Sequence, residues 1–407
     1  MPARKLMTLI FLLFCGVTTV PRASVPASGS PAQKTETVIP FKLVNRHIFL
    51  RLKVDNSDPL WFIFDTGDKF AIVDLERAKQ LGLNLHGQIN VGGAGAGVLK
   101  GAYVRDSNFT VPGLEGFTQP VTLAVPLDML EPNFGHDVDG IIGSEFIKQF
   151  VVEVDYPARL LRLHDKQKFS YSGPGEIIPI KLSGGHPIVQ GEVMLPGRDA
   201  IKADFVIDLG SGGSLALHSP FVEKHQLLVT NQKTIRAIGR GGAGGEITGR
   251  IGRISGLKIG KFTIDNPITM FSQDTRGAFA NDAIQGNIGE QIMSRFRILL
   301  DYERSRIILE PNARFREPMD QASSGLKILG EGKDYRTFRI KEVLENSPGT
   351  EAGLQANDVI TGINERPASE FTLPDLIKQF EHALPVKLTV RRGEQTLQVT
   401  LTPRKLV

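Results

Sequence analysis

The chain has 407 residues, a length that suits two or three domains, each with its own core. Its 41% hydrophobic and 23% charged residues are ordinary for a globular protein. The formal net charge is +4, and three of the positive charges, Arg4, Lys5 and Arg22, stand at the extreme N-terminus. We see no basic cluster with interleaved aromatic residues, so the charge does not support binding to nucleic acid.

The first residues predict a signal peptide over 1–27. Arg4 and Lys5 precede an apolar stretch from Leu6 to Val20, and small residues follow it. A membrane-spanning helix needs roughly 20 apolar residues, so we expect cleavage and an exported protein, periplasmic or secreted. Contact with a membrane is expected only if this segment is retained as an anchor. The single cysteine, Cys15, lies within it, so the mature chain would have neither a disulfide nor a thiol nucleophile.

Two apolar runs end in an aspartate that is followed by a glycine two residues later. They are Phe64-Asp65-Thr66-Gly67 and Ile207-Asp208-Leu209-Gly210. An isolated buried carboxylate is costly, so an Asp that closes a buried strand indicates a functional need. Two such residues in repeated contexts predict a paired site, in which carboxylates that share one proton act as acid and base on one water.

The aspartate motifs belong to a longer internal repeat. Asp65 and Asp208 are 143 residues apart, and two later motifs recur at an offset of 146: 139–143 with 285–289, and 150–156 with 296–302. A glycine-rich stretch lies between the motifs in each half, at 92–97 and at 239–245. The repeat predicts a linker at 28–37, one β lobe over 38–175 and a second over 176–312. Short helices are expected directly after the aspartate motifs, at 75–81 and 220–225.

The pattern changes after residue 312. A polar linker is expected at 313–326, and a separate small α/β domain at 327–405. Within that domain the sequence predicts a helix at Leu373–Ala383, with Pro374 in its first turn, and four strands. The strands are Thr337–Val343, Asp358–Ile363, Lys387–Arg391 and Thr396–Thr402.

These motifs resemble retropepsin-like aspartic proteases of the pepsin superfamily that carry a C-terminal PDZ domain. Phe64-Asp65-Thr66-Gly67 matches the first signature of the family, and Ile141-Ile142-Gly143 matches the second. Asn287-Ile288-Gly289 matches the second signature less well. The PDZ resemblance rests on 346–348, 351–354 and 357–364. Together the two resemblances imply a mainly β fold: a duplicated two-lobed aspartic-protease β-barrel followed by a small α/β PDZ domain.

The resemblance also implies an aspartic endopeptidase. Asp65 and Asp208 would be catalytic, and the loops that support them would contain Thr66, Gly67, Leu209, Gly210 and Ser211. In the family the Thr hydroxyl ties the two loops together, and the glycines allow tight turns and a close approach. No cofactor and no metal are expected. The partners would be a protein or peptide substrate at the cleft and a peptide C-terminus at the PDZ groove. That peptide is expected to add alongside 337–343, against the helix that begins at Leu373.

Two residues depart from the family pattern. Leu209 replaces the expected Thr or Ser, and Asp68 places a third carboxylate near the pair. We expect these changes to weaken the site or to shift its working pH upward, because a nearby like charge raises proton affinity. Two alternatives stay open: an inactive protease fold that binds peptides as a scaffold, and a narrow processing enzyme that acts on a single partner.

Other motifs carry less weight. Ser211 lies in a Gly-Ser-Gly sequence similar to a serine nucleophile loop, but no histidine lies in a recognisable context for a base. The histidines show no metal-ligand spacing, and the glycines at 95–97 lack the helix of a dinucleotide-binding unit. The glycine-rich stretches of the two halves are either flaps that close over substrate or plain flexible hairpins.

Overall fold

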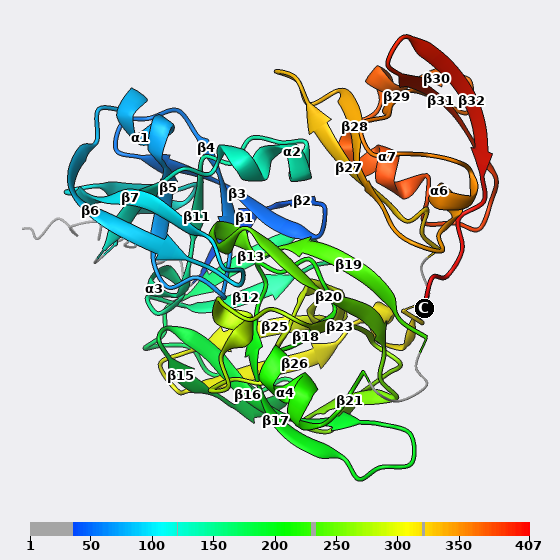
Figure 1. Ribbon diagram of the computed structural model, residues 1–407. Helices are drawn as coiled ribbons and strands as arrows, with labels where there is room; N and C mark the ends of the chain where they lie inside the picture. The colour runs from blue at the N-terminus through cyan, green and yellow to red at the C-terminus, as the bar shows by residue number, and fades with distance from the viewer. Residues whose placement is uncertain (1–35, 120, 229–232, 320–321) are drawn as a thin grey trace, which may run out of the picture. The chain divides into compact units, whose positions relative to one another are not determined.

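The computed structural model describes residues 36–119, 121–228, 233–319 and 322–407 (Figure 1). The predicted signal peptide, Cys15 and most of the 28–37 linker lie outside the described residues. No helix within these ranges is long and apolar enough to cross a membrane. The protein is 46% strand and 14% helix, which confirms the prediction of a mainly β fold.

The first half of the chain forms a ten-stranded sheet. Its strand order is β6 (Asn84–Gly92), β7 (Val98–Arg105), β10 (Thr122–Val125), β5 (Ala71–Asp74), β11 (Gly140–Ile142), β4 (Leu60–Phe64), β3 (His47–Val54), β8 (Asn108–Val111) and β9 (Leu114–Thr118), with β2 (Lys42–Val44) on β3. At the centre of the sheet β11 runs parallel to β4, so the Ile141-Ile142-Gly143 motif lies beside the strand that ends at Asp65.

The second half repeats this order strand for strand. Its order is β19 (Ile235–Arg240), β20 (Glu246–Arg253), β23 (Ile268–Ser272), β18 (Leu215–Leu217), β24 (Gly286–Ile288), β17 (Ile201–Ile207), β16 (His186–Met194), β21 (Gly256–Ile259) and β22 (Phe262–Asp265), with β15 (Lys181–Ser183) on β16. The central parallel pair is now β24 and β17. The duplication predicted from the sequence is therefore present in the fold.

A six-stranded sheet joins the two lobes. Its order is β1 (Glu36–Pro40), β13 (Leu160–His164), β12 (Val151–Asp155), β25 (Phe296–Asp301), β26 (Arg306–Pro311) and β14 (Glu176–Pro179). At its centre, Glu153 of β12 accepts hydrogen bonds from Arg297 of β25 and Arg162 of β13. Burial alone would raise the pKa of Glu153, but the hydrogen bonds to His164 and Arg297 and the charges of Arg297 and Arg162 lower it to about 2.

Short helices follow the aspartate motifs, as the sequence predicts. Helix α1 (Leu75–Gln80) begins at Asp74, whose side chain accepts from the Arg77 N–H and so caps the first turn. Helix α4 (Ser219–Lys224) occupies the equivalent place in the second lobe. The other helical segments of the lobes are single turns: η1 (Asp128–Leu130), α2 (Glu131–Phe134), α3 (Ser144–Ile147), η2 (Gly242–Gly244), η3 (Ala278–Ala280), α5 (Glu290–Met293) and η4 (Ala313–Arg316).

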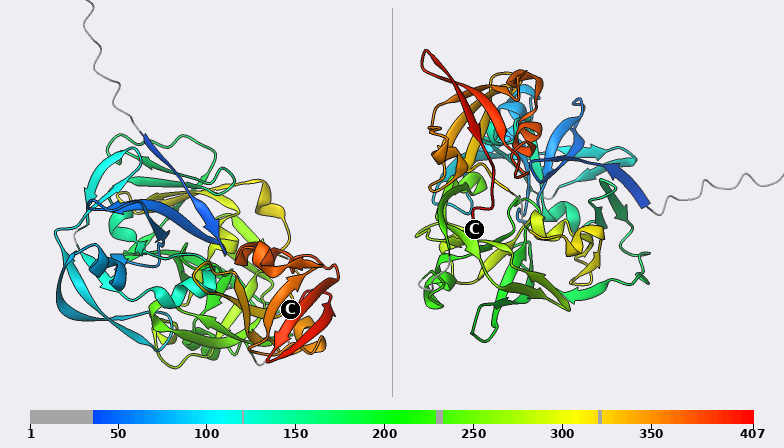
Figure 2. Two further views of the ribbon diagram at one scale, coloured as in Figure 1. Left: turned by 90° about the horizontal axis from the view of Figure 1, so that it is seen from above. Right: turned by 90° about the vertical axis from the view of Figure 1, so that its right-hand side faces the viewer.

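The C-terminal region forms a separate sheet with a hydrophobic core of its own. Its order is β27 (Leu326–Glu331), β28 (Thr337–Val343), β29 (Val359–Ile363), β31 (Val386–Arg392) and β32 (Gln395–Leu401), with β30 (Arg366–Pro367) on β29. The β31–β32 hairpin is drawn in red in Figure 2. The helical segments are α6 (Pro348–Glu351), η5 (Ala368–Glu370) and α7 (Leu373–Lys378). Helix α7 ends five residues before the predicted Ala383, because the N–H groups of Gln379, Phe380 and Glu381 turn to carbonyls three residues back.

The predicted position of the peptide beside β28 is wrong. β28 is hydrogen-bonded to β27 on one side and to β29 on the other, so its backbone has no free edge. β27 is an edge strand of this sheet, and α7 packs beside it. The sequence-based prediction failed because no strand of this domain was predicted before Thr337, so β27 was missed.

Candidate active site

The Asp65 loop is held in place by its own lobe. The Asp65 N–H donates to the Ile142 carbonyl at 3.0 Å, which ties the end of β4 to the end of β11. The Gly67 N–H donates to Asp65 Oδ1 at 2.7 Å, and the loop closes with a longer bond of 3.4 Å from the Asp68 N–H to the Asp65 carbonyl. These bonds fix the carboxylate at the end of a buried strand.

The Asp208 loop repeats the same pattern. The Asp208 N–H donates to the Ile288 carbonyl at 2.9 Å, and the Ser211 N–H donates to the Asp208 carbonyl at 3.3 Å. Gly210 provides a backbone hydrogen bond to the Asp208 carboxylate. The Ser211 carbonyl accepts from the Glu290 N–H at 2.8 Å, which anchors the loop to the first turn of α5.

The two loops bring Asp65 and Asp208 together, with a hydrogen bond between their side chains. Glycine is required on both sides of the meeting point. A Cβ on Gly67 would lie 2.7 Å from Asp208 Oδ1, and a Cβ on Gly210 would clash with the Asp65 carboxyl group. The approach of the carboxylates therefore depends on the two glycines that the motifs share.

Thr66 ties the loops together across the lobes. Its hydroxyl donates to the Ile207 carbonyl at 2.6 Å and accepts from the Leu209 N–H at 2.9 Å, and the residue is completely buried. Leu209, at the equivalent position of the second lobe, is also completely buried and packs in the hydrophobic core. The cross-lobe tie is thus made from one side only.

Three half-buried carboxyl groups share this site. Burial and the charges of Asp208 and Asp68 raise the pKa of Asp65 well above its ordinary value. Burial and the charge of Asp208 raise the pKa of Asp68 to about 6. Burial also raises the pKa of Asp208, but the amide of Asn287 and the N–H of Gly210 oppose that shift. The pair is therefore arranged to hold a proton at a pH where an exposed carboxyl has lost it.

The second lobe supplies a polar contact that the first lobe lacks. Asn287 Nδ2 donates to Asp208 Oδ2 at 2.8 Å, and Asn287 Oδ1 lies 3.0 Å from His218 Nε2. In the sequence Asn287 is a mismatch to an apolar motif, and neither Asn287 nor His218 was predicted to belong to the site. The mismatch was the one sequence signal that could have identified Asn287.

Two histidines occupy equivalent positions at the start of β3 and β16. His47 lies against the second loop, because a Cβ on Gly212 would be 2.7 Å from His47 Cε1. In the second lobe, burial lowers the pKa of His186, and the charge of Asp208 opposes this shift. Burial likewise lowers the pKa of His47. Neither histidine was assigned to the site from the sequence.

The two glycine-rich stretches meet at their tips. The Gly97 N–H donates to the Gly244 carbonyl at 2.7 Å, and the Ala94 N–H donates to the Gly241 carbonyl at 3.2 Å. A Cβ on Gly93 or Gly95 would clash with the backbone of the facing hairpin. We call the β6–β7 hairpin flap 1 and the β19–β20 hairpin flap 2. The glycines therefore allow a backbone-to-backbone contact between two flaps.

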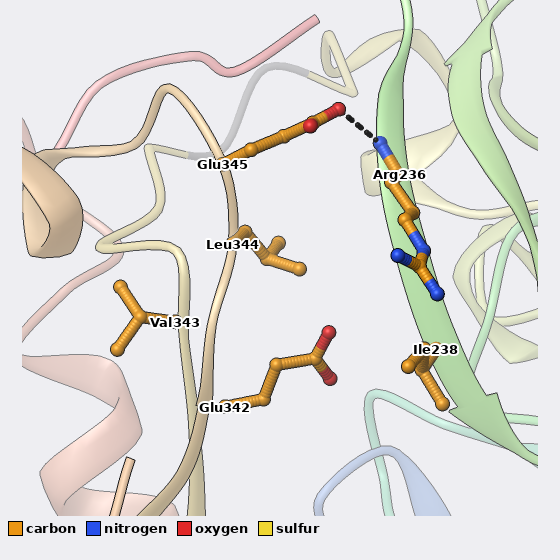
Figure 3. A pocket seen from close by; sticks show the side chains of 6 residues that line it. All are labelled: Arg236, Ile238, Glu342, Val343, Leu344 and Glu345. Atoms are coloured by element: carbon orange, nitrogen blue, oxygen red, sulfur yellow. Dashed lines mark hydrogen bonds between the residues drawn. The ribbon is translucent and has the colours of Figure 1, made fainter. Parts of the chain in front are cut away.

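Flap 2 also contacts the C-terminal sheet (Figure 3). Lys341 Nζ of β28 lies 3.0 Å from Glu246 Oε1 of β20, and the Arg236 N–H of β19 donates to Glu345 Oε1 at 2.9 Å. Lys327 Nζ of β27 donates to the Ile238 carbonyl at 3.3 Å. A pocket lies between β19 and the end of β28 with the loop that follows it. Its lining residues are Arg236, Ile238, Glu342, Val343, Leu344 and Glu345.

The first lobe meets the C-terminal sheet through α2. The Tyr335 hydroxyl donates to Glu131 Oε2 at 2.8 Å and lies 3.1 Å from Asp137 Oδ1. Gly135, which ends α2 with a φ of 60°, lies so close to Leu373 that an added Cβ would come within 2.6 Å of it. Helix α2 therefore packs at the edge of β27, near the start of α7.

No group of three or more His, Cys, Asp or Glu side chains among the described residues is placed to hold a metal ion.

Comparisons with known proteins agree with this architecture. Residues 50–146 match the family model described as aspartyl protease, and residues 314–391 match that of the PDZ domain. The resemblance inferred from the motifs, an aspartic protease region followed by a PDZ domain, is thereby confirmed.

Two individual proteins are similar to parts of the chain. The "Probable protease eep" of Enterococcus faecalis is 32% identical over 78 residues, which are 19% of this chain and 18% of that protein. A crystal structure of an aspartic proteinase from Irpex lacteus aligns with a TM-score of 0.46 and 11% identity, over 69% of this chain and 99% of that one.

Proposed function

We propose that the protein is an endopeptidase that cleaves peptide bonds with Asp65 and Asp208. One observation carries the proposal: two equivalent loops bring two half-buried carboxyl groups into hydrogen-bonding contact, across a boundary where glycine alone fits. Burial and mutual repulsion favour a state in which the pair holds one proton, and this state can donate and accept a proton in a single step.

In the proposed reaction one water lies between the carboxyl groups. The ionised carboxylate takes a proton from the water as its oxygen bonds to the peptide carbonyl carbon, and the protonated carboxyl gives its proton to the carbonyl oxygen. A tetrahedral diol results. Its collapse breaks the C–N bond after a proton passes to the nitrogen, and the dyad again holds a single proton. Closed flaps would exclude bulk water during these steps.

Thr66 supports the geometry that this reaction needs. Its two cross-lobe hydrogen bonds hold the loops at a fixed separation without adding charge. Small displacements of catalytic groups lower the reaction rate strongly, so a buried tie between the loops favours an active site over a degenerate one.

Leu209 favours a second candidate function, a scaffold that binds peptides without cutting them. Leu209 has no hydroxyl, so the cross-lobe tie consists of the two hydrogen bonds from Thr66 to the backbone of the second loop, without a reciprocal tie from the side chain of residue 209 to the first loop. A scaffold would bind an extended peptide under the flaps and release it unchanged.

The experiment that separates the two uses a diverse peptide library and the chain from about residue 28 onward. Wild type, Asp65→Asn and Asp208→Asn would be incubated from pH 3 to 7, with cleavage read by mass spectrometry. We expect cleavage by wild type and a loss of about a hundredfold or more in each variant. Binding of a statine-type transition-state analogue without cleavage of any peptide would instead favour the scaffold. An enzyme restricted to one partner would need that partner as substrate.

We further propose that the protein is exported, on the basis of the apolar segment near its N-terminus.

We also propose that the PDZ domain binds a peptide C-terminus along the outer edge of β27, facing α7, since β27 is an edge strand of its sheet. Helix α2 packs at the same edge, so a bound peptide would compete with the α2 contact. Fluorescence polarisation with C-terminally free and amidated peptides tests this site.

A further inference from the structure

We infer that Asn287, oriented by His218, is a positioning residue that makes Asp208 the carboxylate that accepts the proton of the water and Asp65 the carboxyl that donates its proton to the substrate. This inference deepens the proposed function and rests on it. It separates the roles of two residues that the repeat alone makes equivalent.

The direction of the hydrogen bonds carries the argument. Asn287 Nδ2 lies 2.8 Å from Asp208 Oδ2, and its Oδ1 lies 3.0 Å from His218 Nε2. A side-chain amide has one face that donates and one that accepts. With Oδ1 engaged by His218, Asn287 presents its N–H group to Asp208. A donor at that oxygen stabilises the ionised form of Asp208 over the protonated form.

The surroundings of His218 hold this arrangement in place. The ring is stacked on Phe279, with centroids 4.8 Å apart and planes 29° apart, and His218 is only 4% exposed. Its backbone N–H donates to the Gln285 carbonyl at 2.9 Å, which ties the start of α4 to β24. The imidazole therefore has little freedom to leave Asn287, and the amide has little freedom to turn over.

The first lobe offers no equivalent donor. In the repeat, Ile141 stands where Asn287 stands in the second lobe, beside β4 in the same parallel register. In place of His218 the first lobe has Asp74, whose side chain caps α1 instead of facing the dyad. Asp65 is left with the Gly67 N–H as its donor within its own lobe. The two carboxylates thus differ in their side-chain hydrogen bonding because the second lobe has an amide where the first has an apolar side chain.

The charged groups around the dyad act differently on its two carboxyl groups. The charge of Asp208 raises the pKa of Asp68, so these two groups repel each other when both are ionised. The charge of Asp65 raises the pKa of the buried Tyr302. The two like charges on Asp65 oppose its ionisation, whereas His186 favours ionisation of Asp208.

The first test follows the titration of the aspartates by carboxyl ¹³C NMR, which needs no catalysis. The Asp208 signal would be identified by its loss in Asp208→Asn. We expect Asn287→Leu to shift the titration of Asp208 upward by about one pH unit or more, because a hydrogen bond to a charged group is lost. His218→Phe keeps the stacked ring but removes the Nε2 donor, and should shift Asp208 in the same direction by less.

The second test follows activity. The acidic limb of kcat/KM should move upward by the same amount in Asn287→Leu, while KM stays near the wild-type value, since Asn287 does not touch substrate. Asn287→Gln retains the amide and should recover part of the shift. Ile141→Leu, a conservative change at the equivalent site of the first lobe, is the matched control and should leave both measurements unchanged.

The outcomes separate the inference from the proposed function. If the wild type cleaves no peptide, the proposed function fails while the NMR titration still reports on Asn287. If Asn287→Leu leaves the Asp208 titration where it was, the inference is wrong even in an active enzyme. If Asn287→Leu does not fold, the Asp208 titration in His218→Phe is compared with that in wild type. An unchanged titration would then show that the inference is wrong.

Discussion

The two lobes share their strand order and the glycines of their dyad loops but differ in several other residues near the dyad. The first lobe supplies Thr66 and a third carboxylate, Asp68, whereas the second supplies Leu209 and the amide of Asn287. The flaps differ too: flap 2 contacts the C-terminal region through an ion pair and two hydrogen bonds between side chains and its backbone. A duplicated backbone can thus hold two loops in equivalent places while each lobe contributes a different part of the chemistry.

Thr66 and Leu209 are the sharpest contrast between the lobes, and Thr66→Ala should have the largest effect. The change leaves the buried Ile207 carbonyl and Leu209 N–H without their partner, so we expect a loss of about 3 kcal/mol in the free energy of unfolding. Denaturant unfolding measures this loss, with Thr66→Ser as the control that keeps the hydroxyl. Equal stability of Thr66→Ala and wild type would show that the lobes do not depend on this tie.

The flap contact comes next. Gly95 has no positive φ, so alanine there is tolerated by the backbone of flap 1 alone but clashes with flap 2 when the tips meet. We expect Gly95→Ala to lower kcat/KM by up to about a hundredfold, since the flaps could no longer close to the same position. Gly92→Ala in the same flap has open space around its Cβ and should behave as wild type. Similar losses in both variants would refute a role for the tip contact.

Asp68 sets the first loop apart by its charge. Its folded-state pKa of about 6 lies above the unfolded value, so its favourable contribution to folding is present at low pH and is lost as the pH rises from about 4 through 6. Asp68→Asn should therefore gain stability relative to wild type at pH 7 and little at pH 4. The basic limb of kcat/KM should move downward, by up to about one unit, as Asp65 loses a neighbouring charge. A basic limb that stays in place would show that Asp68 does not act on the dyad.

The ion pair between Lys341 and Glu246 should have the smallest effect. Because it is partly exposed, we expect Lys341→Glu to weaken the contact of flap 2 with the C-terminal sheet by about 0.2–1 kcal/mol. Hydrogen exchange should then rise in β19 and β20 but not in β6 and β7.

The double variant Lys341→Glu/Glu246→Lys reverses both charges and should restore protection. Lys387→Glu, which breaks an exposed pair with Glu365 elsewhere in the C-terminal sheet, is the matched control. Faster exchange in flap 1 as well as flap 2 would mean that the contact does not act on flap 2 alone.

The sequence by itself determined the duplication, the position of both aspartates and the C-terminal domain. These features are local or periodic: an apolar run with a terminal Asp-x-Gly, a repeat at constant offset, and short helices with recognisable caps. Pairing partners are not local. No strand was predicted over β27, which misplaced the peptide edge, although β28 itself was predicted with its observed bounds.

The tertiary structure alone decided how the two halves meet. The one-sided tie of Thr66, the contact of the two flap tips and the reach of Asn287 to Asp208 each join residues about 80 or more positions apart. In the sequence Asn287 was only an imperfect match, because a polar residue in an apolar motif has no meaning until the strand beside it is known. Parallel pairing of β24 with β17 places that amide next to a carboxylate, and this proximity gives the substitution its chemical consequence.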